Sequence, residues 1–191
     1  MNRLAWLLAA AVSTAVPAFA QEPTPGATPA AAPAPELVVE TEQGSFTIRL
    51  LPELAPRHVQ HFLSVARKGG FDGTTFHRII PRGIVQGGDP ISKDPAKASA
   101  YGTGGLGLLK AEFSDRAMTR GTVAAVLRPR QKDSGGNQFF ICLTDQPALT
   151  GQYTIFGEVR AGMEVVDRIG ETPVAGDRAT VRVEMRKVSV N

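Results

Sequence analysis

The sequence predicts a mainly β fold, either a sandwich or a closed barrel. Short runs rich in β-branched and aromatic residues recur at regular spacing, and only two segments have helical periodicity. The 20 glycines and 14 prolines among 191 residues supply many turns. With 42% hydrophobic residues, the chain is too apolar to be disordered throughout. A closed barrel would also leave no sheet edge exposed to other chains.

The first elements are a β-hairpin and a helix. Strands over 37–39 and 45–51 flank a Gln-Gly turn, and apolar residues alternate with polar ones along the second strand. Pro56 favours the first turn of a helix because its φ angle is already helical. Apolar residues then follow Val59 at the spacing of one helix face, and the glycines at 69–70 end the helix.

The rest of the chain has further short strands and a second helix. The second helix, over 163–169, lies between Gly162 and Gly170. In the last predicted strand, apolar and charged residues alternate, which is typical of a half-buried strand. We expect these further strands over 75–80, 84–86, 122–127, 138–143, 153–159 and 180–190.

Two segments precede the predicted domain. Residues 1–20 combine Arg3, a short apolar run and a final Ala-x-Ala pattern, which indicates a secretory signal cleaved after Ala20. The apolar run is too short for a membrane-spanning helix, which needs about 20 residues. Residues 21–35 are rich in Pro and Ala, and we expect a disordered, extended linker. One domain, 36–191, follows.

Charge and cysteine content exclude several functions. The 21 basic and 18 acidic residues give a formal net charge of +3, and the basic residues are scattered, so we expect no nucleic-acid binding. The single cysteine, Cys142, excludes an intramolecular disulfide and a multi-cysteine zinc site. Because it lies in an apolar run, it is interpreted as a packed small side chain rather than a nucleophile.

Two further motifs have the wrong context. Gly102-x-Gly104-x-x-Gly107 has the spacing of a dinucleotide-binding loop, but no apolar strand precedes it and no helix start follows it. We interpret it as a glycine-rich loop. His58 and His61 could share a metal, but His58 lies off the predicted apolar helix face and no carboxylate ligand is apparent. We expect no metal site.

The informative residues lie in two segments about fifty residues apart. The first reads Phe-His-Arg-Ile-Ile-Pro over 76–81 and is followed by Gln-Gly-Gly-Asp over 86–89; the second is Gly-Asn-Gln-Phe-Phe-Ile over 136–141. Strand alternation places Arg78 on one face with Phe76 and Ile80, and likewise Gln138 with Phe140. Taken alone, these patterns favour a structural interpretation, with Arg78 as a surface charge and Gln138 as a strand amide with ordinary hydrogen bonds.

Both segments closely resemble the cyclophilin family of peptidyl-prolyl isomerases. The resemblance also includes 71–75, 111–113, 120–122 and 151–157, and it runs in order over residues 38–190. It implies a closed eight-stranded antiparallel β-barrel capped by two α-helices, with a substrate groove on the outer face. It also implies an enzyme that accelerates rotation about Xaa-Pro peptide bonds.

The resemblance assigns site residues. It implies that Arg78 is catalytic, with Gln86 and Gln138 holding the peptide backbone, and that His77 faces inward in a structural role. The substrate-binding positions are implied to be Phe76, Ile84, Phe140, Leu149 and Tyr153.

The chain also departs from the family pattern. Gly83 stands where a bulky aromatic wall is usual, Ala148 replaces a rim tryptophan, and Tyr153 replaces a frequent histidine. We expect Gly83→Phe to raise kcat/KM by restoring the wall. Gly83 and Ala148 favour an alternative function, a non-catalytic or weakly active chaperone module that binds proline-containing segments. The retained residues favour the enzyme: Arg78, Gln86, Gln138 and Phe140.

The signal segment and the resemblance together imply a biological role. We expect a periplasmic or secreted enzyme that acts on proline-containing, unfolded or partly folded exported polypeptides. No cofactor is implied. We further expect a monomer without stable membrane insertion after signal cleavage.

Overall fold

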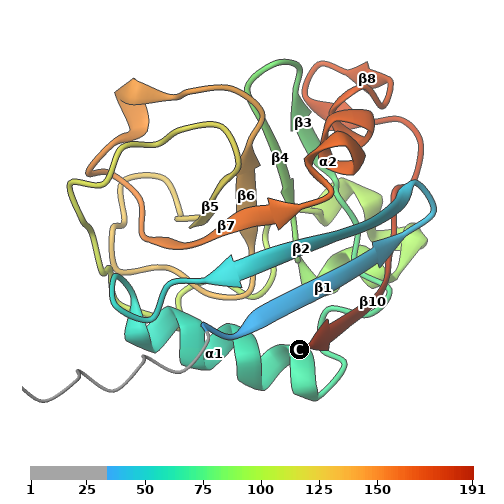
Figure 1. Cartoon of the computed structure of the whole chain (residues 1–191). Helices are drawn as coiled ribbons and strands as arrows, with labels where there is room; N and C mark the ends of the chain where they lie inside the picture. Colours follow the sequence, from blue (N-terminus) through green and yellow to red (C-terminus); the bar gives the residue numbers. More distant parts are fainter. Residues whose placement is uncertain (1–33) are drawn as a thin grey trace, which may run out of the picture. The chain divides into compact units, whose positions relative to one another are not determined.

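The computed structural model describes residues 34–191 and contains one antiparallel sheet (Figure 1). The predictions for residues 1–20, and for all of 21–35 except its last two residues, lie outside the described residues. In sheet order the strands are β10 (Met185–Val190), β1 (Glu36–Thr41), β2 (Gly44–Leu50), β7 (Ile155–Ala161), β5 (Thr122–Ala125), β6 (Phe139–Cys142), β4 (Ile84–Gly87), β3 (Arg78–Ile80), β9 (Arg178–Ala179) and β8 (Val174–Ala175).

The expected closed barrel of eight strands is corrected by this topology. The sheet has ten strands in residues 34–191 and stays open, with β10 at one end and β8 at the other. Residues 74–76 and 183–185 meet at an isolated bridge, Thr75–Glu184, which two backbone hydrogen bonds flank and which does not extend into a strand ladder. The amide of Thr75 donates to Ser92 Oγ instead of extending a ladder. The predicted strands 75–80 and 180–190 are therefore shortened.

Helix α1 (Pro56–Arg67) follows from its sequence. Proline occupies the first turn, Val59, Phe62 and Ala66 are buried on one face, and Gly69 adopts a left-handed φ of +64° just beyond the end. Helix α2 (Met163–Gly170) likewise buries one apolar face. Within residues 34–191, no helix is long and apolar enough to cross a membrane.

Three short 3-10 helices were not predicted. They are η1 (Pro90–Lys93), η2 (Pro95–Ala100) and η3 (Pro147–Leu149). Each begins at a proline, whose fixed φ suits the first turn. Asp89 and Asp94 cap the first two through their carboxylates. Ala98 of η2 and Leu149 of η3 border the groove described below.

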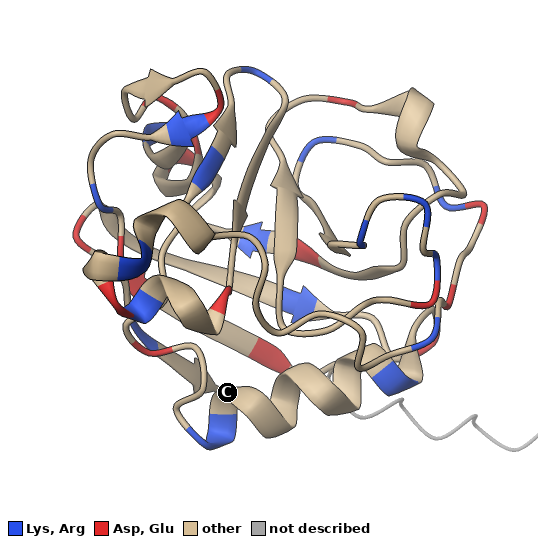
Figure 2. Cartoon of the chain, turned by 180° about the vertical axis from the view of Figure 1, so that it is seen from behind, with Lys and Arg blue, Asp and Glu red and all other residues tan. Residues whose placement is uncertain are grey.

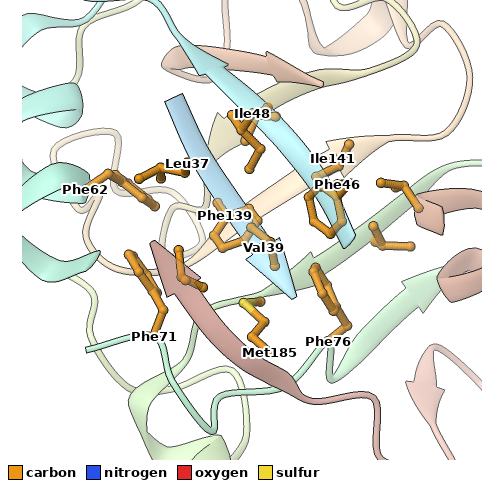
Figure 3. Close-up of a cluster of buried hydrophobic side chains, with 14 of the residues drawn as sticks. Leu37, Val39, Phe46, Ile48, Phe62, Phe71, Phe76, Phe139, Ile141 and Met185 are labelled. Atoms are coloured by element: carbon orange, nitrogen blue, oxygen red, sulfur yellow. The ribbon is translucent and has the colours of Figure 1, made fainter. Parts of the chain in front are cut away.

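The main core fills the concave side of the sheet (Figure 3). Phe62 of α1 stacks on Phe156 with ring centroids 4.0 Å apart and also contacts Phe71 and Phe139. Such aromatic pairs add about 0.5–1.5 kcal/mol each beyond the burial of their surface. This cluster therefore ties α1 to β6 and β7.

A second apolar cluster lies on the other face of the same strands. Along β6, Phe139 and Ile141 belong to the main core, whereas Phe140 and Cys142 belong to the second cluster. This alternation is the one predicted from the sequence. Cys142 is fully buried, and burial raises the pKa of its thiol to about 12, which confirms a packed rather than a nucleophilic role.

Strands β1 and β10 lie side by side along the sheet edge (Figure 1). The amide of Asn191 donates to the carbonyl of Glu36 at 2.9 Å. The first strand of the described chain is thus paired with the last.

Candidate active site

A groove of about 1160 Å³ lies on the outer face of the sheet. The strand pair β3–β4, the loop after β5, the η3 region and the β8–β9 hairpin contribute to its walls. Part of its floor is the second apolar cluster. The groove therefore joins an apolar surface to the place where β3 pairs with β9.

Arg78 lies where β3 pairs with β9, and two side chains hold its guanidinium. Its Nε donates to Asp177 Oδ2 at 2.7 Å, and its Nη1 donates to Gln86 Oε1 at 3.2 Å. The side chain is 39% exposed, and Nη2 has no protein acceptor among residues 34–191. The guanidinium is consequently fixed in orientation while its outer N–H groups remain available in the groove.

Asp177 is a site residue that sequence reasoning missed. It sits in the turn of the β8–β9 hairpin, beside Gly176 with a left-handed φ of +67°. Its backbone carbonyl accepts from Ile79 at 2.8 Å, which holds the hairpin against β3. The hydrogen bond from Arg78 lowers the pKa of the Asp177 carboxyl below its usual value. Asp177 is therefore an anion when it holds Arg78.

Gln86 and Gln138 extend this hydrogen-bond chain inward. Gln86 Nε2 donates to Gln138 Oε1 at 3.0 Å, and Gln138 Nε2 donates to the carbonyl of Gly104 at 2.7 Å. Gln86 borders the groove, but Gln138 is fully buried and does not. The structure therefore places Gln138 behind Gln86, where it supports the other side chain.

The apolar residues predicted for the groove come together. Ile84 and Phe140 are buried in the second cluster, and Leu149 and Tyr153 pack against it, partly exposed. The Phe140 and Tyr153 rings meet edge to face, with centroids 5.2 Å apart. All four border the groove. They form an apolar surface of the kind that accepts a proline ring.

Phe76 borders the groove, but most of its contacts are in the main core. Its side chain is fully buried there, next to Phe46 and Phe139 (Figure 3). The regular strand begins only at Arg78, so the alternation does not extend back to residue 76. His77 is also buried, as the resemblance implied, and burial lowers its pKa.

Ile80 covers the position beside Gly83. A Cβ at Gly83 would lie 2.9 Å from Ile80 Cγ2, and both residues border the groove. Ile80 is 39% exposed although it is a large apolar residue. The missing aromatic at 83 is therefore partly replaced from β3. Ala148 lies in η3, is exposed, and does not border the groove.

The two other sequence motifs have structural roles. The backbone amides of Gly102 and Gly104 donate to the buried carboxylate of Asp89, which holds the glycine-rich loop beside the groove. His58 is buried, contrary to expectation, and its Nδ1 lies 2.6 Å from Glu112 Oε2. His61 Nε2 lies 2.7 Å from Asn137 Oδ1 instead. The two histidines thus have separate partners.

The fold has known relatives among solved structures. A crystal structure of a cyclophilin type peptidyl-prolyl cis-trans isomerase from Cryptosporidium parvum, in the presence of the dipeptide Ala-Pro, superposes with a TM-score of 0.72. The alignment covers 82% of this chain and 98% of that chain at 23% identity. The protein therefore has the cyclophilin fold.

Sequence comparison gives the family. The family model described as "Cyclophilin type peptidyl-prolyl cis-trans isomerase/CLD" matches residues 36–190. A probable peptidyl-prolyl cis-trans isomerase of Brucella suis is 39% identical over 145 residues, or 73% of this chain and 74% of the relative. A peptidyl-prolyl cis-trans isomerase of Arabidopsis thaliana is 36% identical over 159 residues, or 82% and 93%. The chain belongs to the cyclophilin-type peptidyl-prolyl isomerase family.

Proposed function

We propose that this protein accelerates cis–trans isomerisation of Xaa-Pro peptide bonds, with Arg78 as the catalytic residue. The observation that carries the proposal is the placement of the Arg78 guanidinium, held by Asp177 and Gln86 at the edge of an apolar groove. Family membership and the names of the relatives support the same activity.

The reaction requires a lower barrier to rotation about an amide bond. Resonance makes this barrier roughly 18–20 kcal/mol, and uncatalysed Xaa-Pro isomerisation takes tens to hundreds of seconds. The planar amide is more polar than the twisted one. A proline ring seated against Ile84, Phe140 and Tyr153 displaces water that would stabilise the planar form.

Arg78 acts on the twisted amide itself. As the C–N bond rotates, the prolyl nitrogen loses conjugation and gains a lone pair, which a guanidinium N–H can meet with a hydrogen bond. This interaction is stronger in the transition state than in the ground state, as catalysis requires. Arginine remains charged at any working pH. Gln86, at the same edge, holds a backbone group of the peptide.

The test measures cis–trans exchange of an Ala-Pro-Phe peptide by NMR with the purified protein. We expect Arg78→Ala to lower kcat/KM by about 100- to 1000-fold, the range for loss of one transition-state donor. Arg78→Lys should lose most of the activity because lysine lacks the planar fork. Arg160→Ala, an exposed change outside the groove, serves as the control. A folded Arg78→Ala protein with wild-type turnover would contradict the mechanism.

The same experiment distinguishes the isomerase from the alternative function, binding without catalysis. Gly83, which leaves one groove wall to Ile80, favours a module that binds proline-containing segments with little catalysis. In that case the peptide resonances would shift on binding without faster exchange. Acceleration that depends on Arg78 supports the enzyme.

We further propose that the clients are exported polypeptides in the periplasm or outside the cell. The signal-like segment 1–20 and the Pro/Ala-rich segment 21–35 support this location. Mass spectrometry of the protein recovered from a secreting cell should find an N-terminus at Gln21. An intact Met1 would contradict export by cleavage.

A further inference from the structure

The side chains that border the groove carry an excess of positive charge. Over the whole chain, 21 basic residues are nearly balanced by 18 acidic ones, and Figure 2 shows both kinds distributed around the described fold. The groove is different, because Asp177 is its only acidic lining residue among residues 34–191. Its basic lining residues are Arg78, Arg128, Arg178 and Arg182.

Two of these arginines have no neutralising partner. Arg78 is paired with Asp177, and Arg182 with Glu184 at 2.9 Å. Among residues 34–191, neither Arg128 nor Arg178 forms an ion pair. Both are exposed and both border the groove. Their charge is therefore open to whatever occupies it.

Backbone carbonyls hold both guanidinium groups in place. Arg128 Nη2 donates to the carbonyl of Leu106 at 3.0 Å, and Arg178 Nη1 donates to the carbonyl of Ala98 at 2.9 Å. These contacts use only part of each guanidinium, so further N–H groups can meet a carboxylate. Arg178 is also the direct register partner of Arg78 across β3 and β9. The two cations thus lie at either end of segment 98–106, which borders the groove.

We propose that Arg128 and Arg178 make the groove selective for Xaa-Pro segments that carry an acidic residue close to the proline. This inference rests on the proposed function and names its substrate class. A carboxylate that enters the groove near either end of segment 98–106 meets an exposed cation that forms no ion pair, and it is attracted there. A lysine at the same position meets repulsion instead. The preference is electrostatic, so salt should weaken it.

The experiment compares matched peptides by NMR exchange at low salt. The peptides are Ala-Xaa-Ala-Pro-Phe-Ala-Ala and Ala-Ala-Ala-Pro-Phe-Xaa-Ala, with Xaa as Glu, Gln or Lys. In at least one of the two peptide sequences, we expect kcat/KM for the Glu peptide to exceed that for the Gln peptide by about two- to fivefold. This is the range for one exposed ion pair. The Lys peptide should be slowest. In 0.5 M NaCl the ratio of Glu to Gln should approach one.

Variants identify the cations. Arg128→Gln or Arg178→Gln should lower the ratio of Glu to Gln, whereas Lys187→Gln on β10, outside the groove, should preserve it. Equal rates for Glu and Gln in the wild type would overturn the proposal. So would an equal loss of the ratio in Lys187→Gln, because the effect would then come from net charge.

The proposed selectivity for acidic peptides and the proposed isomerase function can be contradicted independently of each other. Catalysis is tested by the Gln peptide alone, and selectivity by the ratio between peptides. If no peptide were turned over, peptide titrations would still compare the affinity for Glu and Gln. Equal affinities would then overturn the selectivity as well.

Discussion

Arg78 donates to two acceptors that have different consequences. Gln86 belongs to the neighbouring strand β4, and its amide is backed by the buried Gln138, so this contact is rigid. Asp177 comes from a hairpin far along the chain and adds a negative charge next to the catalytic cation. That charge weakens the field of Arg78 but fixes the plane of its guanidinium.

We predict that Asp177 is a positioning residue for Arg78. Asp177→Ala should lower kcat about tenfold with a smaller change in KM, because a misplaced donor loses transition-state contact. Asp177→Asn keeps an acceptor oxygen and should recover part of this loss. Asp167→Ala, on α2, removes a comparable ion pair with Arg120 and should leave kcat unchanged. Wild-type kcat in Asp177→Ala would show that Gln86 alone suffices.

At the scale of an element, the β3–β4 hairpin determines one wall of the groove. Ile80 ends β3, Gly83 precedes β4, and the amide of Leu143 donates to the Gly83 carbonyl at 2.8 Å. The backbone at 83 is thus fixed, and only the side chain of Ile80 is free to move. The expectation that Gly83→Phe simply restores a wall therefore needs revision, because the new Cβ meets Ile80 Cγ2.

The two positions should behave non-additively. Ile80→Ala should raise KM about threefold through lost apolar contact with the substrate. Gly83→Phe alone should lower stability and give no gain in kcat/KM, whereas the double variant should recover the wild-type KM. Thermal unfolding and peptide kinetics are measured on the wild type, the two single variants and the double variant, which together form a double-mutant cycle. A gain in kcat/KM from Gly83→Phe alone would show that the Ile80 side chain moves aside for the new ring at little cost.

At the scale of the whole molecule, burial of histidines links folding to pH. Burial lowers the pKa of His77, and burial likewise lowers the pKa of His58 despite the nearby Glu112. Both histidines therefore bind a proton more readily in the unfolded chain, where the pKa is about 6.5. The free energy of unfolding therefore has its full value above about pH 6.5. It falls as the pH decreases below 6.5, because the unfolded state takes up more protons than the folded state.

Urea unfolding at pH 7.5, 6.5 and 5.5 measures this dependence. We expect the free energy of unfolding to fall below pH 6.5 by at most about 1.4 kcal/mol per pH unit for each histidine. His77→Asn, which keeps a donor towards the Thr75 carbonyl, should flatten the dependence. An unchanged slope would assign the effect to other groups.

The sequence predicted most of what depends on local pattern. Pro56 and the spacing of Val59, Phe62 and Ala66 are sufficient for α1, and alternation is sufficient for β6. The family resemblance pointed to Arg78 and to five apolar residues that border the groove. Local pattern did not reveal that the regular strand begins only at Arg78, nor that the Thr75 amide donates to Ser92 Oγ.

Two site features depend on contacts that no local pattern contains. Asp177 lies 99 residues from Arg78, in a hairpin whose strands have only two residues each and so show no alternation. Gln138 is buried because the carbonyl of Gly104 reaches its amide across the glycine-rich loop. Such tertiary contacts decide which polar residues face a ligand and which support their neighbours.

The pairing of β1 with β10 has a topological consequence. Because Glu36 and Asn191 already share a hydrogen bond, a few glycines could join residue 191 to residue 36. New ends could then open at the exposed turn around Glu53, between β2 and α1. Such a circular permutant would keep every strand partner that builds the groove. The pairing of the strands therefore does not require that the chain begins at β1 and ends at β10.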